Sequence, residues 1–213
     1  LTSVLEQFGV RCELTDRSRM DQAVRQAMLK DNSIGRQLDL SFFDASNPRK
    51  LKVKLEIDTH PPAGTGTSWH YLDFPVDFEV CAQDLPSNYA LKLHALLCRP
   101  YLKGRDWFDF AWYNKQQTRP NLPHLARALN QAGPWKDQDI RLDAQWLTDA
   151  LTAKIRTISW SLAAQDVAPF LPASEQASLT LWSERFFDDK VSRLTSSLLP
   201  PSPAYPGHQT LSK

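Results

Sequence analysis

The sequence contains little cysteine and no paired cysteine motif. Its three cysteines, Cys12, Cys81 and Cys98, lie far apart, and no Cys-x-x-Cys occurs. Neither a disulfide framework nor a zinc site is therefore indicated, which favours a reducing, cytoplasmic setting. No signal-peptide pattern and no apolar run of bilayer length occur either, so we expect no association with a membrane.

The chain also lacks a strong excess of either charge. Its 25 lysines and arginines stand against 24 aspartates and glutamates, for a formal net charge of +1. A surface that coats nucleic acid over its whole extent is therefore not indicated, although a local basic pocket is. Hydrophobic residues make up 42% of the 213 residues, which is enough for a buried core in one large domain or two small ones.

Hydrophobic periodicity divides the chain into two regions. Apolar residues at helical spacing predict helix within residues 1–30, whereas residues 36–82 follow the period of two that is typical of half-buried strands. The period changes at Asp84, a suitable helix N-cap, which is followed by Pro86. We predict helices beyond it, carrying Leu93 and Trp107 and then covering 121–131, 141–162 and 174–195.

These patterns predict an α+β fold. A small mixed sheet with helices is followed by a helical C-terminal half. The corresponding regions are residues 1–83, residues 84–198, and a loose proline-rich tail over 199–213.

A glycine-rich stretch, Gly64-Thr65-Gly66-Thr67-Ser68, superficially resembles a phosphate-binding loop. It lacks the Lys-Ser/Thr ending of a P-loop, and the pattern after it is not helical. We therefore interpret it as a hairpin connection between strands.

The strand predicted over residues 50–58 places four charged side chains on one face, since side chains alternate along a strand. They are Lys52, Lys54, Glu56 and Asp58. One interpretation is a solvated sheet face with cross-strand ion pairs. The other is a site in which Lys54 contacts phosphate while Glu56 or Asp58 holds a divalent cation, because Mg²⁺ prefers carboxylate oxygens and substrate phosphates.

A second set of charges lies in apolar helical sequence. Lys92 and Arg99 are seven residues apart and share a helix face, and Arg105 lies four residues before Asp109 on the next helix. Ion pairing on the helix surface is the simplest interpretation. The second interpretation is a buried Arg-Asp pair, Arg105-Asp106, that organises the structure, with Lys92 left to face a ligand.

The same segments resemble the AbiEii/AbiGii nucleotidyl transferase toxin family, the toxin half of type IV toxin–antitoxin systems. Lys54-Leu55-Glu56-Ile57-Asp58 resembles the family's strand motif of Lys-x-acid. Ala90-Leu91-Lys92 resembles its Ala-x-Lys helix, and Arg99 with Arg105-Asp106-Trp107-Phe108-Asp109 resembles its Arg…Arg-Asp-x-x-Asp motif. The resemblance runs over most of residues 20–190.

The resemblance implies a nucleotidyltransferase-like core followed by a helical region. It implies transfer of a nucleotide from an NTP, with Mg²⁺, to tRNA or another RNA acceptor, and a cognate antitoxin protein as partner. It assigns catalytic roles to Lys54, Glu56, Lys92, Arg105, Asp106 and Asp109, nucleotide binding to Lys54, Lys92 and Arg99, and metal binding to Glu56 with Asp58 as second choice. Lys54 and Lys92 would hold the triphosphate, Asp106 and Asp109 would position or activate the acceptor, and Arg105 would orient them or bind phosphate.

One departure from the family pattern limits what the given residues are expected to do. The family's first motif is a Gly-Ser turn followed by a metal-binding Asp-x-Asp, whereas no Gly-Ser occurs here and the single Asp-x-Asp is Asp137-Gln138-Asp139, downstream of the other motifs. We therefore interpret the sequence as the C-terminal part of such an enzyme, inactive by itself. The alternative is a degenerate, non-catalytic module that binds a partner protein or RNA. We predict that Lys54, Glu56, Lys92 and Asp109 converge on one cleft although they are distant in the sequence.

Overall fold

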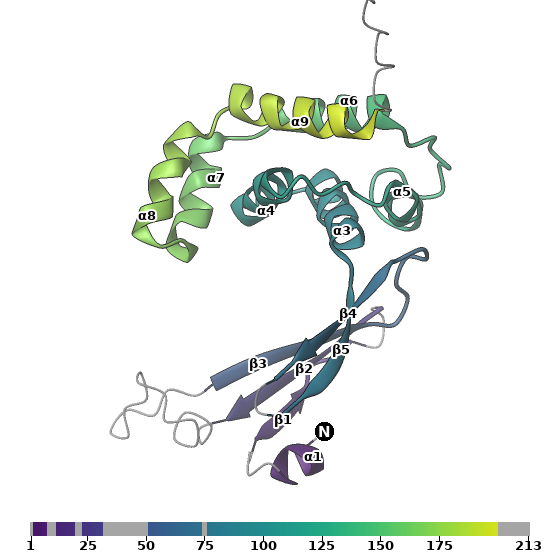
Figure 1. The fold of residues 1–213 in the computed structure, drawn as a ribbon, viewed down its shortest axis with the longest axis vertical. Helices are drawn as coiled ribbons and strands as arrows, with labels where there is room; N and C mark the ends of the chain where they lie inside the picture. The colour runs from purple at the N-terminus through teal and green to yellow at the C-terminus, as the bar shows by residue number, and fades with distance from the viewer. Residues whose placement is uncertain (1, 8–11, 20–22, 32–50, 74–75, 200–213) are drawn as a thin grey trace, which may run out of the picture. The chain divides into compact units, whose positions relative to one another are not determined.

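The computed structural model describes residues 2–7, 12–19, 23–31, 51–73 and 76–199 (Figure 1). The chain divides into two compact units, Leu1–Pro61 and Pro62–Lys213, which we describe separately. The α+β class is confirmed. Among the described residues both sheets are antiparallel, whereas we predicted a mixed sheet.

The first unit contains an antiparallel three-stranded sheet. A short helix, α1 (Thr2–Gln7), precedes the strands β1 (Glu13–Asp16), β2 (Val24–Asp31) and β3 (Leu51–Asp58), which lie side by side in that order (Figure 1). The register places Gln26 of β2 directly opposite Glu56 of β3. The strand predicted at 50–58 is thus confirmed as β3.

The prediction of helix within residues 1–30 holds only for α1 among the described residues. The segments 13–16 and 24–31 are strands instead. The helical spacing of Val24, Ala27 and Met28 is a weak local preference, and pairing of β2 with β3 along its whole length outweighs it. The strand predicted near residues 38–42 lies outside the described residues.

The apolar face of β3 is more exposed than expected. Val53 and Ile57 retain 45% and 65% of their accessible surface. The described part of this unit places no layer over these two side chains, so the prediction of a half-buried strand is not met there.

The second unit begins with a hairpin and continues as helices. β4 (Thr67–Leu72) pairs antiparallel with β5 (Phe78–Gln83). The helices are α3 (Leu85–Cys98), α4 (Gly104–Lys115), α5 (Leu122–Gln131), α6 (Ala144–Ile155), α7 (Trp160–Val167), α8 (Ala173–Gln176) and α9 (Glu184–Leu198), with 3₁₀ turns η1 (Ala168–Phe170) and η2 (Ala177–Leu181). The switch from strands to helices at Asp84 is therefore confirmed.

Local capping chemistry fixes where several of these helices start. The Asp84 carboxylate accepts a hydrogen bond from the Ser87 N–H at 2.8 Å, as predicted for an N-cap. Asn121, Asp143 and Ser183 cap α5, α6 and α9 in the same way. Each cap satisfies a backbone donor that the first helical turn leaves unpaired.

Two predicted helices are divided in the structure. The segment 141–162 forms α6 and α7 with a break at residues 156–159, and the segment 174–195 forms α8, η2 and α9. The second break comes where Ser183 adopts extended backbone to cap α9. A capping residue inside a long apolar segment therefore divides the predicted helix in two, because a residue with extended backbone cannot continue a helix.

The glycine-rich loop is not a hairpin connection, because β3 and β4 belong to different sheets. Its backbone is committed to the helices: the Gly66 N–H donates to Ser87 Oγ at 2.8 Å, and the Gly64 carbonyl accepts from Asn121 Nδ2 at 3.0 Å. A side chain at Gly66 would overlap the Asp84 carboxylate. The glycine thus allows close packing against a helix cap, which agrees with our rejection of a phosphate-binding loop.

The core of the second unit lies between helices. α3 packs on α4 and α5, α4 packs on α7 and α9, and α6 lies along α9 (Figure 1). An aromatic cluster fills the centre, made of Trp107, Phe110, Trp160 and Phe187. Aromatic pairs of this kind add stability beyond their buried area.

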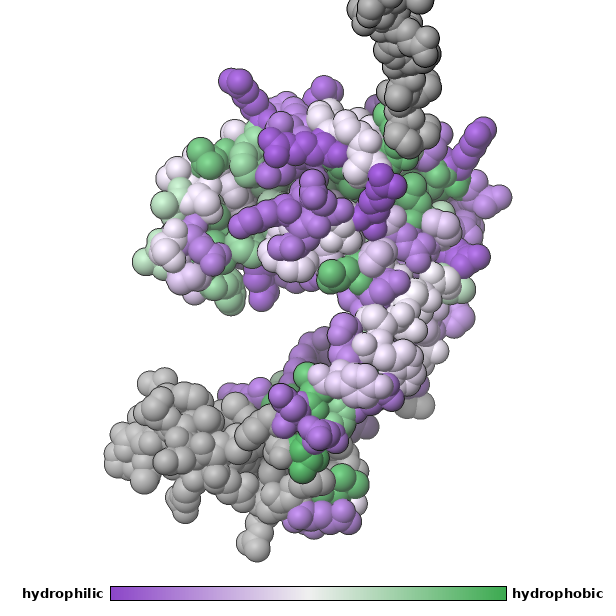
Figure 2. Space-filling view, in the orientation of Figure 1, coloured by the Kyte–Doolittle hydropathy of each residue, from purple (hydrophilic) through white to green (hydrophobic). Residues whose placement is uncertain are grey.

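The surface of the helices is mixed in character. On the face shown in Figure 2, hydrophilic side chains are spread over the helices with smaller hydrophobic patches between them. Among the described residues, no helix is both long enough and apolar enough to span a membrane.

Candidate functional site

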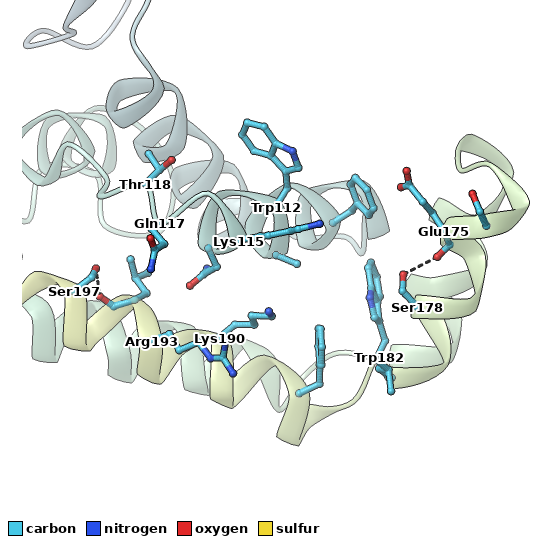
Figure 3. Close-up of a pocket in the computed structure, with 17 residues that line it drawn as sticks. Trp112, Lys115, Gln117, Thr118, Glu175, Ser178, Trp182, Lys190, Arg193 and Ser197 are labelled. Atoms are coloured by element: carbon cyan, nitrogen blue, oxygen red, sulfur yellow. Dashed lines mark hydrogen bonds between the residues drawn. The ribbon is translucent and has the colours of Figure 1, made fainter.

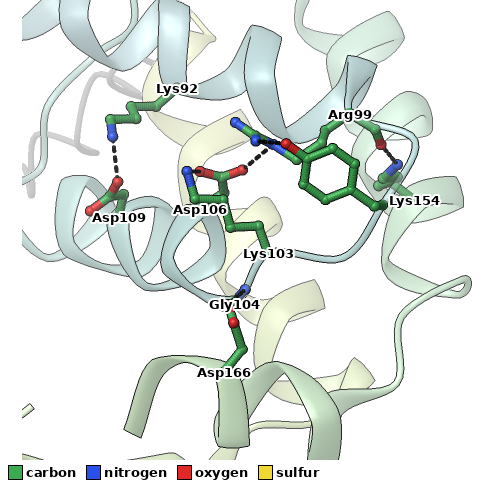
Figure 4. Close-up of polar contacts among 9 residues, drawn as sticks. Lys92, Arg99, Lys103, Gly104, Asp106, Asp109, Lys154 and Asp166 are labelled. Carbon is green, nitrogen blue, oxygen red and sulfur yellow. Dashed lines mark hydrogen bonds and ion pairs between the residues drawn. The ribbon is translucent and has the colours of Figure 1, made fainter. Parts of the chain in front are cut away.

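The first candidate group is an ion pair that joins two neighbouring helices. Lys92 on α3 and Asp109 on α4 lie with Nζ and Oδ2 2.6 Å apart (Figure 4). Their side chains retain 44% and 32% of their accessible surface, so both stay within reach of solvent. A pair of this exposure adds little to stability, and either member can exchange its partner for a charged ligand.

The second pair joins the same two helices but is buried. Arg99 Nε lies 2.8 Å from Asp106 Oδ2, and the Asp106 side chain is only 6% exposed (Figure 4). Lys103 Nζ lies 3.9 Å from the other carboxylate oxygen. The backbone carbonyl of Arg99 also accepts from Lys154 Nζ at 2.8 Å, which ties this end of α3 to α6. Asp106 is therefore committed to holding the helices together.

These contacts correct the pairing expected from the sequence. The buried partner of Asp106 is Arg99 of the preceding helix, and not its neighbour Arg105. The Arg105 guanidinium instead lies 4.5 Å from the centre of the Phe170 ring, a cation–π contact at the surface. Arg99 is further held by a 2.6 Å hydrogen bond from Nη1 to the Tyr101 hydroxyl.

Two stacked tyrosines lie behind the Lys92–Asp109 pair. The rings of Tyr89 and Tyr113 are parallel within 6° and 4.5 Å apart. Burial raises the pKa of the Tyr113 hydroxyl, with Lys92 lowering it and Asp109 raising it by smaller amounts. Tyr113 is therefore close enough for both charges to influence its hydroxyl group.

The start of α4 is fixed against α7. The Gly104 N–H donates to Asp166 Oδ2 at 2.7 Å (Figure 4). A side chain at Gly104 would overlap the carbonyl oxygen of Ala163. Gly104 is thus a point of close contact between α4 and α7, and it helps to set the position of Asp106 and Asp109.

In the first unit, two of the four charged side chains of β3, Lys54 and Glu56, pair with each other. Lys54 Nζ lies 2.6 Å from Glu56 Oε1. The same oxygen accepts a hydrogen bond of 3.1 Å from Nε2 of Gln26, which lies on β2. Asp58 Oδ1 accepts from the His60 N–H at 2.9 Å. Both side chains of the Lys54–Glu56 pair are about half exposed.

The described residues do not fit a magnesium ion by themselves. They contain no group of three or more His, Cys, Asp or Glu side chains placed to hold a metal. Glu56 Oε1 is engaged by a lysine and an amide, and Asp58 Oδ1 accepts from a backbone amide, so a cation here would need further carboxylate ligands. The Asp137-Gln138-Asp139 sequence lies in a turn, with Asp137 and Asp139 both at positive φ. No chemical step is therefore assigned to a metal here.

The structure brings together the predicted residues of each unit separately. Lys92, Arg99, Asp106 and Asp109 form one cluster along α3 and α4. Lys54 and Glu56 form another on β3. Convergence of the two clusters stays a prediction.

A groove that the sequence did not indicate lies between α4, α8, η2 and α9. Its volume is about 840 Å³. Four aromatic side chains line it: Phe108, Trp112, Trp182 and Phe186. On α4, positions 108, 111, 112 and 115 follow the i, i+3, i+4, i+7 spacing of one helix face, which is the signal that could have indicated it.

Three cations, Lys115, Lys190 and Arg193, also line this groove, against one carboxylate, Glu175 (Figure 3). Lys115 is exposed and has no ion partner among the described residues. The lining is thus positive although the whole chain is nearly neutral.

Comparison with known proteins identifies the class. Residues 1–192 match the family model described as nucleotidyl transferase AbiEii toxin, Type IV TA system. Neither the curated proteins nor the solved structures gave a match to this chain. The chain belongs to the AbiEii nucleotidyl transferase toxin family, so the family predicted from the sequence is confirmed.

Proposed function

We propose that this chain carries the nucleotide- and acceptor-positioning residues of an AbiEii nucleotidyltransferase that transfers a nucleotide from an NTP to an RNA acceptor such as tRNA. The observation that supports this most strongly is the Lys92–Asp109 pair. Both residues lie in segments that resemble the family's motifs, and the pair is half exposed on helices that the buried Arg99–Asp106 pair holds together.

In this proposal Lys92 binds the triphosphate. An incoming phosphate competes with Asp109 for the ammonium group, and a charge-assisted hydrogen bond of this kind contributes about 1.5–3 kcal/mol. Lys54, on β3, supplies a second phosphate contact. Glu56 is the preferred metal ligand, in combination with carboxylates that the described residues do not provide.

Asp109 is the group that acts on the acceptor. In the reaction an acceptor hydroxyl oxygen forms a bond to the α-phosphorus of the NTP, the bond to the β-phosphate oxygen breaks, and pyrophosphate leaves. The proton of the hydroxyl must pass to a base, and Asp109 is released for this role once phosphate has taken Lys92. Asp106 and Arg99 serve as positioning residues, since each is occupied by the other.

The test is nucleotide transfer. Radiolabelled NTPs, Mg²⁺ and total tRNA are incubated with this chain and, in parallel, with the product of its full reading frame. We expect labelled RNA from a protein that carries a Gly-Ser turn and an Asp-x-Asp pair, loss of most labelling in its Glu56→Ala and Asp109→Asn variants, and none from residues 1–213 alone. Robust labelling by residues 1–213 would show that their own carboxylates make a complete metal site.

A second candidate function is non-catalytic RNA binding. The absence of Gly-Ser from the given residues and the turn position of Asp137 and Asp139 favour it. Under this alternative no form of the protein would transfer nucleotide, yet RNA would still bind. In either case the toxin–antitoxin family implies a cognate antitoxin, and a cytoplasmic location remains our expectation.

A further inference from the structure

We propose that the groove between α4, α8, η2 and α9 binds the single-stranded end of the RNA acceptor. The inference rests on the proposed function for the role of that strand, while the binding itself can be tested separately. The groove has the size of a ligand site and combines the two features that single-strand sites share, aromatic platforms and cations.

The aromatic side chains provide faces on which bases can stack. Trp112 retains 40% of its accessible surface, and it is supported from one side by an edge contact with Tyr113 at 4.9 Å. Trp182 is held from behind by Phe187 at 5.2 Å. Both residues line the groove; in Figure 3 the Trp182 ring borders the space between α4 and α9, whereas the Trp112 ring projects from the other side of α4 and forms an edge of the groove. A paired base in a duplex cannot offer its face to them, so the groove favours a single strand.

The cations are placed for phosphates between the bases. Lys190 Nζ lies 5.1 Å from the centre of the Phe186 ring, so its charge is held over an aromatic face. Arg193 pairs with Asp189 at 2.9 Å, one turn away on the exposed side of α9. Lys115 and Lys190 both project into the groove in Figure 3. Among the described lining residues Glu175 is the only carboxylate, so the groove favours an anionic strand over an uncharged apolar peptide.

One lining residue, Trp112, lies near the candidate catalytic pair on α4, although Lys92 and Asp109 themselves do not line the groove. Trp112 is three residues after Asp109, and side chains at this spacing are neighbours on a helix surface. A strand that stacks on Trp112 therefore ends next to the carboxylate that we assign to the acceptor hydroxyl. This proximity is the reason for choosing the acceptor end as the occupant.

The experiment measures binding of RNA to the complete 213-residue chain. The probe is a fluorescein-labelled, unstructured RNA of about ten nucleotides, within the range of known single-strand sites, with the matching duplex as comparison. Fluorescence anisotropy is recorded at several salt concentrations for wild type and four variants. Three change the groove: Trp112→Ala, Trp112→Phe and the double variant Lys115→Gln/Lys190→Gln. The fourth, Lys136→Gln, is the control, because it changes an exposed lysine outside the groove. Circular dichroism confirms that each variant is folded.

We expect the single strand to bind more tightly than the duplex. Trp112→Ala should weaken it about fivefold to a hundredfold, the range found for loss of one stacked base, and Trp112→Phe should keep most of the affinity. The double lysine variant should reduce the slope of log K against log salt by roughly 1.4, since each cation contributes about 0.7 on a single strand. Lys136→Gln should match wild type.

Equal binding by wild type, Trp112→Ala and the double lysine variant would overturn the proposal, and so would preference for the duplex or for an acidic peptide.

NTP binding, measured beside RNA binding, separates the groove proposal from the proposed function. If RNA binds in the groove but NTP does not bind, the proposed function fails and the groove assignment holds. If transfer occurs but groove variants transfer normally, the groove assignment alone fails.

Discussion

At the residue scale, two ion pairs of similar length have different roles because their burial differs. The Arg99–Asp106 pair is enclosed, and a buried charge that loses its partner is costly. The Lys92–Asp109 pair is half exposed, where water replaces a lost partner. Distance alone would not separate the structural pair from the functional one.

This difference predicts opposite effects of two alanine substitutions. Arg99→Ala should lower the free energy of unfolding by about 3 kcal/mol, because Asp106 would keep only the distant Lys103. Lys92→Ala should change it by less than about 1 kcal/mol. Urea unfolding followed by circular dichroism gives both values. A larger loss for Lys92→Ala than for Arg99→Ala would contradict our assignment of the two pairs.

A second residue-scale prediction concerns Cys98. Burial raises the pKa of its thiol to about 11, and nearby Lys154 only partly opposes this. At pH 8 only about one in a thousand Cys98 side chains is then in the reactive thiolate form. We expect Cys98, in a variant that keeps it as the single cysteine, to react with Ellman's reagent at least tenfold more slowly than exposed Cys81 does. Equal rates would show that Cys98 is accessible and ionised.

At the element scale, the sequence predicted what depends on local chemistry. The Asp84 cap, the start of α3 and the strand β3 follow from neighbouring residues, and the structure confirms them. β2 was missed because its strand state depends on pairing with β3, about thirty residues away. The partner of Asp106 and the groove were missed for the same reason, since both depend on how separate helices pack.

The contact between α4 and α7 gives an element-scale prediction. In most helices Gly→Ala is stabilising by up to about 1 kcal/mol. Gly104→Ala should instead destabilise the protein by about 2 kcal/mol, because the added methyl group would overlap the Ala163 carbonyl oxygen and force α4 away from α7. Thermal unfolding measures the change. A variant as stable as wild type would mean that α4 and α7 can separate without cost.

At the scale of the whole molecule, the account depends on charges from distant parts of the sequence acting on one nucleotide. Lys54 lies on β3 and Lys92 on α3, and each has a carboxylate partner of its own. If both contact the same triphosphate, Lys54→Ala and Lys92→Ala should each weaken NTP binding. Their combined effect should then differ from the sum of the two, since groups that share a ligand are coupled.

The most direct test of the central claim is therefore calorimetric binding of each NTP, with Mg²⁺, to the chain and to its Lys92→Ala variant. The account predicts that wild type binds and that Lys92→Ala binds about tenfold to a hundredfold more weakly, the loss expected for one charge-assisted contact, while Lys136→Ala binds as wild type does. No binding by wild type, or unchanged binding by Lys92→Ala, would contradict it.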